Sequence, residues 1–299
     1  MNSCEGRVAI VTGAGRGVGR AYALMLAAQG ARVVVNDLGA TAGGEGADLS
    51  PAEEVVREIT AAGGTAIADG TDISNFEAAK GLIDNTVEQF GKLDVLINNA
   101  GILRDRMMVN MSEDDWDSVI KVHLKGTFAP CHHAANYWRA QSKAGNQLDA
   151  RIINTTSASG LFGNIGQANY AAAKAGIASF SIVIARELSR IGVTVNCIGP
   201  RAETRMTEGL REKTEEQIMR RDPEWIAALV TWLASPASKD ITGRVFEAWG
   251  YGYSVAEGWT HGPITEATRD PMQVEETLRQ IINASRFNAG IERDMWLNP

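Results

Sequence analysis

The chain has few cysteines and few histidines, and their spacing argues against two kinds of site. The three cysteines (Cys4, Cys131 and Cys197) are odd in number and far apart, so we expect reduced thiols and no disulfide framework. The four histidines lack carboxylate or cysteine companions at metal-site spacing, and we therefore expect no metal centre. The formal net charge of −7 gives no basic field that would attract nucleic acid or anionic lipid.

Long apolar runs are also missing. No window approaches the roughly 18 uninterrupted apolar residues of a membrane span. No basic segment precedes an apolar run near the first residue, which argues against a secretory signal. We therefore expect a cytoplasmic protein with no membrane partner. With 299 residues, 44% of them hydrophobic, the chain can bury the core of one extended α/β domain or of two small ones.

Short apolar runs alternate with segments of helical periodicity. This pattern predicts a single doubly wound α/β (Rossmann) domain over residues 1–255, with a seven-stranded parallel sheet covered by helices on both faces. The predicted strands are residues 8–11, 32–35, 65–68, 95–98, 151–154, 193–197 and 245–248. The predicted helices are residues 17–29, 52–62, 76–90, 113–139, 170–190, 224–234 and 272–284. Residues 256–299 are too few for a core of their own, so we expect a C-terminal extension packed on the domain or on a partner subunit.

A glycine-rich segment, Thr12-Gly13-Ala14-Gly15-Arg16-Gly17-Val18-Gly19, follows the first predicted strand and opens a helix. Glycines at such a turn let the backbone approach a pyrophosphate, which the helix N-terminus then favours. Asp37, at the end of the second strand, is placed to bond both ribose hydroxyls of NAD and to repel the 2′-phosphate of NADP. Arg16 favours NADP instead, but the carboxylate is the more direct discriminator. Asp72 is placed to meet the adenine amine, unless it is an ordinary loop aspartate.

Tyr170 and Lys174 are separated by one helical turn, so both side chains lie on one face. An ammonium there favours the phenolate and lowers the phenol pKa from about 10. Such a phenol can take a proton from an alcohol, or return one to a ketone, while hydride passes to or from a nicotinamide. The alternative is that this alanine-rich segment is only the start of a helix.

The glycine motif, Asn98-Asn99-Ala100-Gly101, Ser157, Tyr170 and Lys174 together resemble the short-chain dehydrogenase/reductase family over about residues 6–255. The resemblance implies that Tyr170 is the acid/base, that Lys174 binds the nicotinamide ribose and that Ser157 hydrogen-bonds the substrate oxygen. It also implies a homodimer or homotetramer formed through the long helices. The implied cofactor residues are Gly13, Arg16, Gly17, Val18, Gly19, Asp37, Asp72, Ile73, Asn99, Ala100, Gly101, Tyr170, Lys174, Pro200 and Thr204.

One position departs from the general family pattern. His123 lies where many members have an asparagine that anchors a proton-relay water. An imidazole can relay protons near neutral pH, so we include His123 among the catalytic candidates. The alternative is a packed core histidine.

A narrower resemblance covers the segments around Asp37, His123, Ser157 and Tyr170. They are similar to the (3R)-hydroxyacyl-CoA dehydrogenase module of the peroxisomal multifunctional β-oxidation enzyme and its stand-alone bacterial relatives. This implies an NAD-dependent oxidoreductase that interconverts a (3R)-hydroxyacyl-CoA, fatty or steroidal, and its 3-oxoacyl-CoA. The alternatives are a 17β-type hydroxysteroid dehydrogenase, a general 3-oxoacyl reductase and, remotely, an NAD-sensing protein without turnover.

Two arginine pairs follow predicted strand ends, Arg104/Arg106 and Arg201/Arg205. On an acidic protein such a cluster could bind CoA phosphates through charge-assisted hydrogen bonds. We take Arg104 and Arg205 as substrate-binding candidates beside Ser157 and Tyr170. Asp105 and Glu203 lie between the arginines, so internal salt bridges explain the pairs equally well.

Overall fold

A central sheet organises the chain in the computed structural model, which describes residues 2–202, 216, 219–267, 269, 271–286 and 289–290. Its strand order is β3-β2-β1-β4-β5-β6-β7-β8, so the order reverses between β1 and β4. The strands are β1 (Val8–Thr12), β2 (Arg32–Asn36), β3 (Thr65–Asp69), β4 (Val95–Asn98), β5 (Ala150–Thr155), β6 (Val193–Pro200), β7 (Val245–Trp249) and β8 (Gly252–Ala256).

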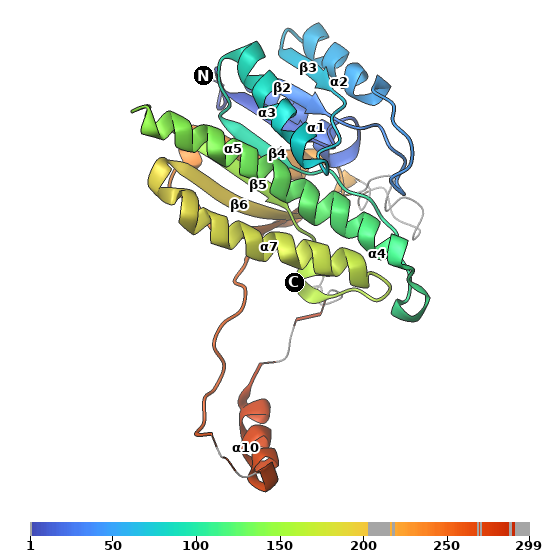
Figure 1. Cartoon of the computed structure of the whole chain (residues 1–299), viewed down its shortest axis with the longest axis vertical. Helices are drawn as coiled ribbons and strands as arrows, with labels where there is room; N and C mark the ends of the chain where they lie inside the picture. Colours follow the sequence, from blue (N-terminus) through green and yellow to red (C-terminus); the bar gives the residue numbers. More distant parts are fainter. Residues whose placement is uncertain are drawn as a thin grey trace.

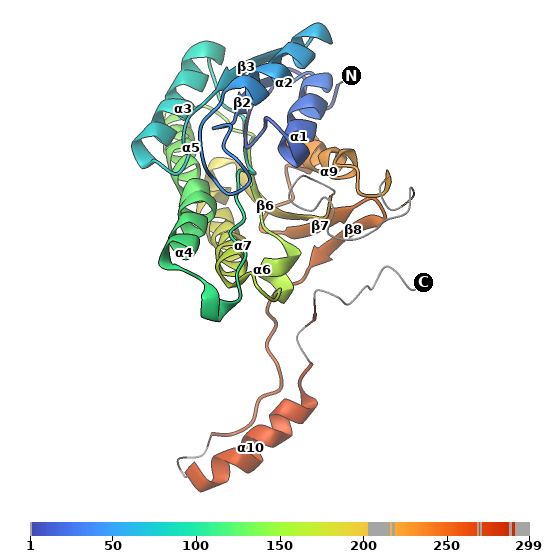
Figure 2. The same ribbon diagram turned by 90° about the vertical axis from the view of Figure 1, so that its right-hand side faces the viewer.

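Helices cover both faces of this sheet (Figures 1 and 2). On one face lie α1 (Gly17–Ala28), α2 (Ser50–Ala61) and α9 (Glu224–Ala234); on the other lie α3 (Phe76–Phe90), α4 (Glu113–Ile120), α5 (Gly126–Lys143) and α7 (Ala168–Leu188). The shorter elements are α6 (Ala158–Phe162), η1 (Met108–Asn110), η2 (Lys121–Lys125), η3 (Ser189–Ile191) and η4 (Pro236–Ser238). Separate apolar clusters fill the two layers, because the central strands are buried on both faces.

The predicted doubly wound fold is confirmed, with one added strand. Strands β1 to β7 pair in parallel, whereas β8 pairs with β7 in the antiparallel direction. Trp249 faces Gly252 in this register, so Gly250 and Tyr251 form a two-residue hairpin turn. The glycine in this turn is a hairpin signal that the prediction of seven strands overlooked. In the structure, the residues of β8 alternate between half-buried and exposed.

The long helix predicted over residues 113–139 is interrupted. Helix α4 ends at Ile120, a π-helical turn (η2) spans Lys121–Lys125, and α5 begins at Gly126. The hydrophobic period predicts continuous helix but does not reveal a change from i+4 to i+5 hydrogen bonding, which adds a residue to one turn. The interruption concerns the candidate site, because His123 lies within η2 and its side chain is buried.

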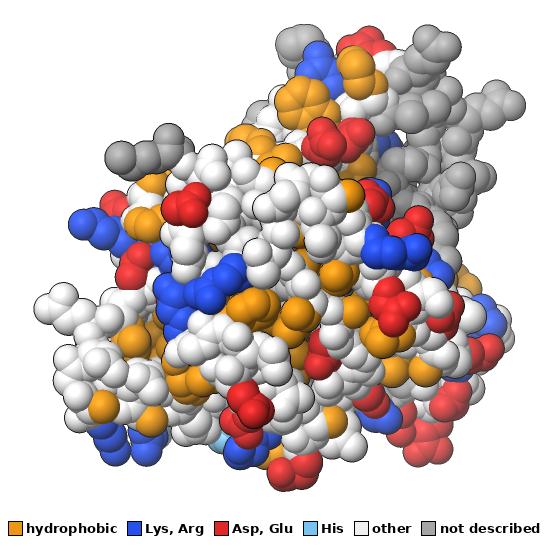
Figure 3. Space-filling model, turned by 90° about the horizontal axis from the view of Figure 1, so that it is seen from above, with side chains coloured by type: hydrophobic (Ala, Val, Ile, Leu, Met, Phe, Trp, Pro, Cys, Tyr) orange, Lys and Arg blue, Asp and Glu red, His pale blue; other side chains and the backbone are white. Residues whose placement is uncertain are grey.

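Helix α7, with the turn after it, is long and apolar enough to cross a membrane by length and composition alone. It packs against β5 and β6, however, and its alanine-rich face forms part of the core. On the face seen in Figure 3, Lys and Arg side chains are interspersed with Asp and Glu, and no continuous basic area is visible among the side chains described there.

The C-terminal extension carries α10 (Pro271–Ala284), which stands apart from the sheet and its helices in Figure 1. Several of its apolar side chains are exposed, including Met272 at 88% and Ile282 at 63%, as is Trp259 at 95% in the preceding segment. Contact of this extension with a partner subunit stays a prediction.

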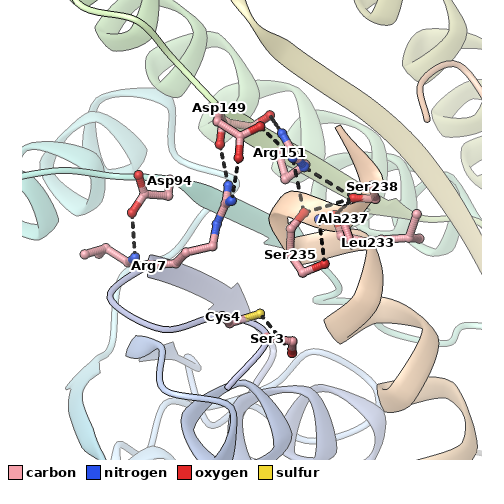
Figure 4. Close-up of polar contacts among 12 residues, drawn as sticks. Ser3, Cys4, Arg7, Asp94, Asp149, Arg151, Leu233, Ser235, Ala237 and Ser238 are labelled. Carbon is pink, nitrogen blue, oxygen red and sulfur yellow. Dashed lines mark hydrogen bonds and ion pairs between the residues drawn. The ribbon is translucent and has the colours of Figure 1, made fainter. Parts of the chain in front are cut away.

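Two buried arginines hold the amino ends of β1 and β5 together (Figure 4). Arg7 and Arg151 both pair with Asp149, at 2.9 and 2.6 Å. Arg151 also donates to the carbonyl oxygen of Ser235 at 3.1 Å and to the hydroxyl of Ser238 at 3.4 Å. The cluster therefore joins the sheet to the end of α9, and it lies at the edge of the sheet opposite the carboxyl ends of the strands.

Candidate active site

Ser157, Tyr170 and Lys174 come together at the carboxyl end of β5. Ser157 is the N-cap of α6, and its side chain is hydrogen-bonded to Tyr170. Lys174 lies one turn after Tyr170 on α7, with its Nζ 5.6 Å from the centre of the tyrosine ring. The Thr156 hydroxyl donates to the carbonyl oxygen of Lys174 at 2.7 Å and so fixes α7 against the end of β5.

Burial is the largest cause of the pKa shifts of Tyr170 and Lys174. It raises the pKa of Tyr170 above its usual value, against a smaller lowering from the hydrogen bond with Ser157. It also lowers the pKa of Lys174 to about 8. The expected lowering of the phenol pKa by Lys174 is therefore not seen in the protein alone. The reason is geometric: the Lys174 ammonium donates to the Thr155 carbonyl oxygen at 2.7 Å instead of contacting the phenol oxygen.

His123 packs against Tyr170 as a neutral imidazole. Its ring meets that of Tyr170 edge to face at 5.1 Å, and burial lowers the pKa of His123 to about 3. Nε2 lies 3.0 Å from the amide nitrogen of Ile102 and 2.8 Å from its carbonyl oxygen, so either tautomer finds one partner there. Nδ1 is buried with no hydrogen-bond partner among the described residues.

The glycine turn fits closely against the end of β4. A Cβ atom on Gly13, whose φ is +62°, would lie 2.7 Å from Cα of Ala100, and one on Gly19 would lie 2.2 Å from the Gly13 carbonyl oxygen. Asn99 Nδ2 donates to the carbonyl oxygens of Thr12 and Gly13, both at 3.0 Å. Asn99 therefore supports the turn, and only glycine fits at the two positions.

The same turn has the features that a dinucleotide requires. Arg16 is the N-cap of α1 but makes no side-chain cap, and the first turn carries no acidic residue, so no described side chain competes for the helix N-terminus. One oxygen of Asp37 accepts from the Gly15 amide and the other from the Gly39 amide, both at 2.7 Å. The residues present thus fit a pyrophosphate and a ribose, with Asp37 held in place by the backbone.

The remaining predicted cofactor residues are distributed along the carboxyl ends of the strands. Asp72 accepts from the Ser74 amide at 2.9 Å, as an ordinary loop aspartate does, and Ile73 is buried against Gly126. Gly101 is required by His123, since a Cβ there would lie 2.2 Å from the ring. Pro200 ends β6, whereas Thr204 and Arg205 lie outside the described residues.

The described arginines of the two pairs have partners within the protein. Arg104 pairs with Asp114 at 2.8 Å, and Arg201 pairs with the buried Glu247 at 3.0 Å. Arg106 donates to the carbonyl oxygen of Asp105 at 2.9 Å. Internal salt bridges, the alternative to phosphate binding, are therefore present. The partners of Arg104 and Arg201 are Asp114 and Glu247, which are not their neighbours in the sequence.

Asn169 is a site residue that the sequence reasoning missed. It is fully buried, and its Nδ2 donates to the carbonyl oxygens of Arg104 at 3.0 Å and Asp115 at 2.9 Å. Its Oδ1 accepts from the Tyr170 amide at 2.8 Å. An asparagine just before the candidate tyrosine, at the start of a helix, was the available signal. Gln167 acts similarly by joining Ser159 and Asp105.

The described part of the chain shows no group of three or more His, Cys, Asp or Glu side chains that could hold a metal ion. Cys4, Cys131 and Cys197 are free and buried. Burial raises the pKa of Cys131 to about 12 and that of Cys197 to about 11, so both thiols are protonated near neutral pH.

A sequence model described as short chain dehydrogenase matches residues 7–215, which include the glycine turn, Ser157, Tyr170 and Lys174. The chain belongs to the short-chain dehydrogenase family. Membership makes this dehydrogenase an oxidoreductase that acts on a secondary alcohol and uses a nicotinamide cofactor, NAD(P).

Three members of the family are similar to this dehydrogenase over most of its length. Hydroxyacyl-CoA dehydrogenase ChsB1 of Mycobacterium tuberculosis is 47% identical over 256 residues, covering 82% of this chain and 78% of that protein. The peroxisomal hydratase-dehydrogenase-epimerase of Neurospora crassa is 45% identical over 82% of this chain, which spans only 26% of that larger protein. The crystal structure of a short chain dehydrogenase from Mycobacterium avium has a TM-score of 0.87 at 50% identity, covering 96% of this chain and 98% of that one.

Proposed function

We propose that this dehydrogenase interconverts a (3R)-hydroxyacyl-CoA and a 3-oxoacyl-CoA with NAD as its cofactor. The observation that carries the proposal is the Ser157–Tyr170–Lys174 group at the end of β5, together with an Asp37 that the backbone holds in place at the end of β2. The acyl-CoA part rests on the names of relatives at 45% and 47% identity.

The reaction follows from what each side chain can do to the substrate oxygen. Ser157 donates a hydrogen bond to the hydroxyl or carbonyl oxygen and so orients it beside Tyr170. Tyr170 takes the hydroxyl proton during oxidation and returns it during reduction. The nicotinamide, when bound, accepts or supplies the hydride. Lys174 supplies positive charge beside the phenol, and burial brings its pKa to about 8, close to working pH.

The preference for NAD is supported by Asp37. Both carboxylate oxygens accept backbone amides at 2.7 Å, which holds the negative charge at the end of β2. A 2′-phosphate placed there would meet that charge at close range, whereas the ribose hydroxyls of NAD can donate to it. Arg16 is exposed at the helix N-terminus and provides a weaker, opposite preference.

The proposal also assigns roles to His123 and to two arginines. His123 contributes a neutral imidazole that seats the Tyr170 ring, and its unpartnered Nδ1 is placed to exchange a hydrogen bond with a relay water. Arg104 and Arg205 are the candidates for the CoA phosphates. Arg104 already pairs with Asp114 through Nη1, so a CoA phosphate would share the guanidinium with that carboxylate.

The test is the initial rate of absorbance change at 340 nm with NADH or NADPH and three matched 3-oxo substrates. These are a short acyl-CoA, a long or steroidal acyl-CoA, and a free ketosteroid. We expect activity with NADH on the thioesters. Activity on the free ketosteroid alone would replace the proposal with a hydroxysteroid dehydrogenase, and cofactor binding without turnover on any alcohol would indicate a sensor.

A further inference from the structure

The loop between β2 and α2 is long and has a defined conformation of its own. We call residues 38–49 the strap. At its base the Asp48 amide donates to the Leu38 carbonyl oxygen at 2.9 Å. At its tip the Thr41 amide donates to the Glu45 carbonyl oxygen at 2.8 Å, and the Gly44 amide donates back to Thr41 at 3.0 Å. The strap therefore has a closed base and a turned tip.

The tip of the strap is attached to the segment that follows β4. The Leu103 amide donates to the Ala42 carbonyl oxygen at 3.0 Å, and Arg104 Nε donates to the Gly43 carbonyl oxygen at 3.1 Å. Gly44 lies against Ile102, since a Cβ on this glycine would be 3.1 Å from the Ile102 side chain. Two hydrogen bonds and one apolar contact thus hold the tip.

The sheet order determines what the strap crosses. It leaves β2 and attaches beyond β4, and β1 lies between those two strands. The strap therefore passes the carboxyl end of β1, where the glycine turn and Asp37 form the dinucleotide site. In doubly wound folds ligands occupy the crevice at this reversal of strand order.

Arg104 connects the strap to α4 and, through its backbone, to the start of α7. Its Nη1 pairs with Asp114 on α4 at 2.8 Å while its Nε holds Gly43. Its carbonyl oxygen accepts from Asn169, which in turn accepts from the Tyr170 amide. The guanidinium is thus held between the strap and α4 beside the start of α7.

We propose that Arg104 is a positioning residue that holds the strap closed across the dinucleotide site, so that cofactor release requires the Arg104–Gly43 contact to break. The inference rests on the cofactor site of the proposed function and is independent of the identity of the substrate. It differs from the assignment of Arg104 to CoA phosphates, because it depends on Nε and Nη1, the two guanidinium nitrogens that bond Gly43 and Asp114.

The test compares Arg104→Met with Arg106→Met, a matched loss of one arginine from the same segment. The Arg106 guanidinium bonds the adjacent Asp105 carbonyl oxygen and has no hydrogen bond to the strap among the described residues. Stopped-flow fluorescence measures the NADH dissociation rate with no substrate present. Hydrogen exchange measures the protection of the Thr41, Gly44 and Leu103 amides in the cofactor-free protein.

We expect Arg104→Met to release NADH about tenfold faster, since it loses a charge-assisted hydrogen bond and its ion pair. It should also exchange the three amides faster, while Arg106→Met stays within about twofold of the unsubstituted protein. Asp114→Asn, on an exposed side chain, should have a smaller effect of the same sign, and it carries the test if Arg104→Met does not fold.

An unchanged NADH dissociation rate with unchanged exchange in Arg104→Met would overturn the inference. So would a raised KM for acyl-CoA with unaltered NADH release, which would assign Arg104 to the substrate. If the protein binds NADPH instead of NADH, the NAD proposal fails, and the same measurement with NADPH still tests the strap.

Discussion

Tyr170, the proposed acid/base, is partly buried next to one hydrogen-bonding partner and one buried ammonium. Burial raises the pKa of the phenol, and the nearest charge, on Lys174, is directed to the Thr155 carbonyl oxygen. The phenol is therefore protonated in the protein alone near neutral pH, which suits it to donate a proton during reduction of a ketone.

Replacement of Tyr170 by phenylalanine removes this proton donor and keeps the ring that packs on His123. We predict that kcat falls by about 10³-fold, within the range for loss of a general acid. The dissociation constant for NADH should change little, because the ring and Lys174 remain. Steady-state rates and NADH fluorescence titration measure the two quantities. A Tyr170→Phe enzyme with more than a tenth of the original kcat would exclude Tyr170 as the acid.

His123 makes stability depend on pH. Its folded-state pKa of about 3 is below the unfolded value of 6.5, so the unfolded chain binds more protons between these values. The stability present above pH 6.5 is therefore lost as pH falls. From pH 6.5 to 5.5 this residue alone should cost about 1 kcal/mol.

Urea denaturation of the unsubstituted protein and His123→Asn at these two pH values tests the sign. The substituted protein should lose less stability over the interval, since asparagine does not titrate. Equal losses in both proteins would show that His123 is not buried in the neutral form.

At the scale of the elements, Asn99 joins β4 to the glycine turn after β1. Its side-chain amide holds two carbonyl oxygens of that turn, and its own backbone amide donates to the Thr12 hydroxyl at 3.0 Å. The cofactor turn is thus supported from a neighbouring strand.

We predict that Asn99→Ala lowers the free energy of unfolding by about 2 kcal/mol, because two carbonyl oxygens lose their donor. Cofactor binding should weaken as well, and saturating NADH should restore part of the stability by binding only the folded state. Denaturation with and without NADH measures both effects. A normal NADH affinity in Asn99→Ala would mean that the turn keeps its shape without this support.

At the scale of the whole molecule, the Arg7–Asp149–Arg151 cluster stabilises the fold at the end of the sheet opposite the proposed catalytic residues. It lies at the amino ends of β1 and β5, whereas Ser157 and Tyr170 lie beyond the carboxyl end of β5. Asp149 is the shared partner of two arginines whose side chains are 8% and 1% exposed.

Removal of Asp149 should therefore destabilise the fold without altering the chemistry. We predict that Asp149→Ala costs about 3 kcal/mol, near the lower limit for breaking a buried pair, because water reaches part of this carboxylate. The matched control is Asp84→Ala in the exposed Lys80–Asp84 pair, which should cost less than about 1 kcal/mol. Both variants should keep kcat at a temperature where they are folded. Equal stability losses would mean that the cluster has no special role.

The local pattern of the sequence was enough to predict the seven parallel strands and most of the helices, and to place Tyr170 and Lys174 on one helix. Hydrophobic period defines the central strands because they are buried on both faces, and the one-turn spacing of Tyr170 and Lys174 follows from helix geometry alone. The glycine turn was predictable from its motif, but part of the reason that only glycine fits at Gly13 and Gly19 lies in Asn99 and Ala100 at the end of β4.

Only the tertiary structure decided which partners these side chains have. The edge-to-face contact of His123 with Tyr170, the direction of the Lys174 ammonium and the Arg104–Gly43 contact depend on residues distant in the sequence. The π-helical turn and the antiparallel β8 were also seen only in the structure, although β8 pairs with the strand just before it. Burial and charge pairing are properties of the assembled layers, so the raised pKa of Tyr170 and the path of the strap across β1 could not be predicted from spacing along the chain.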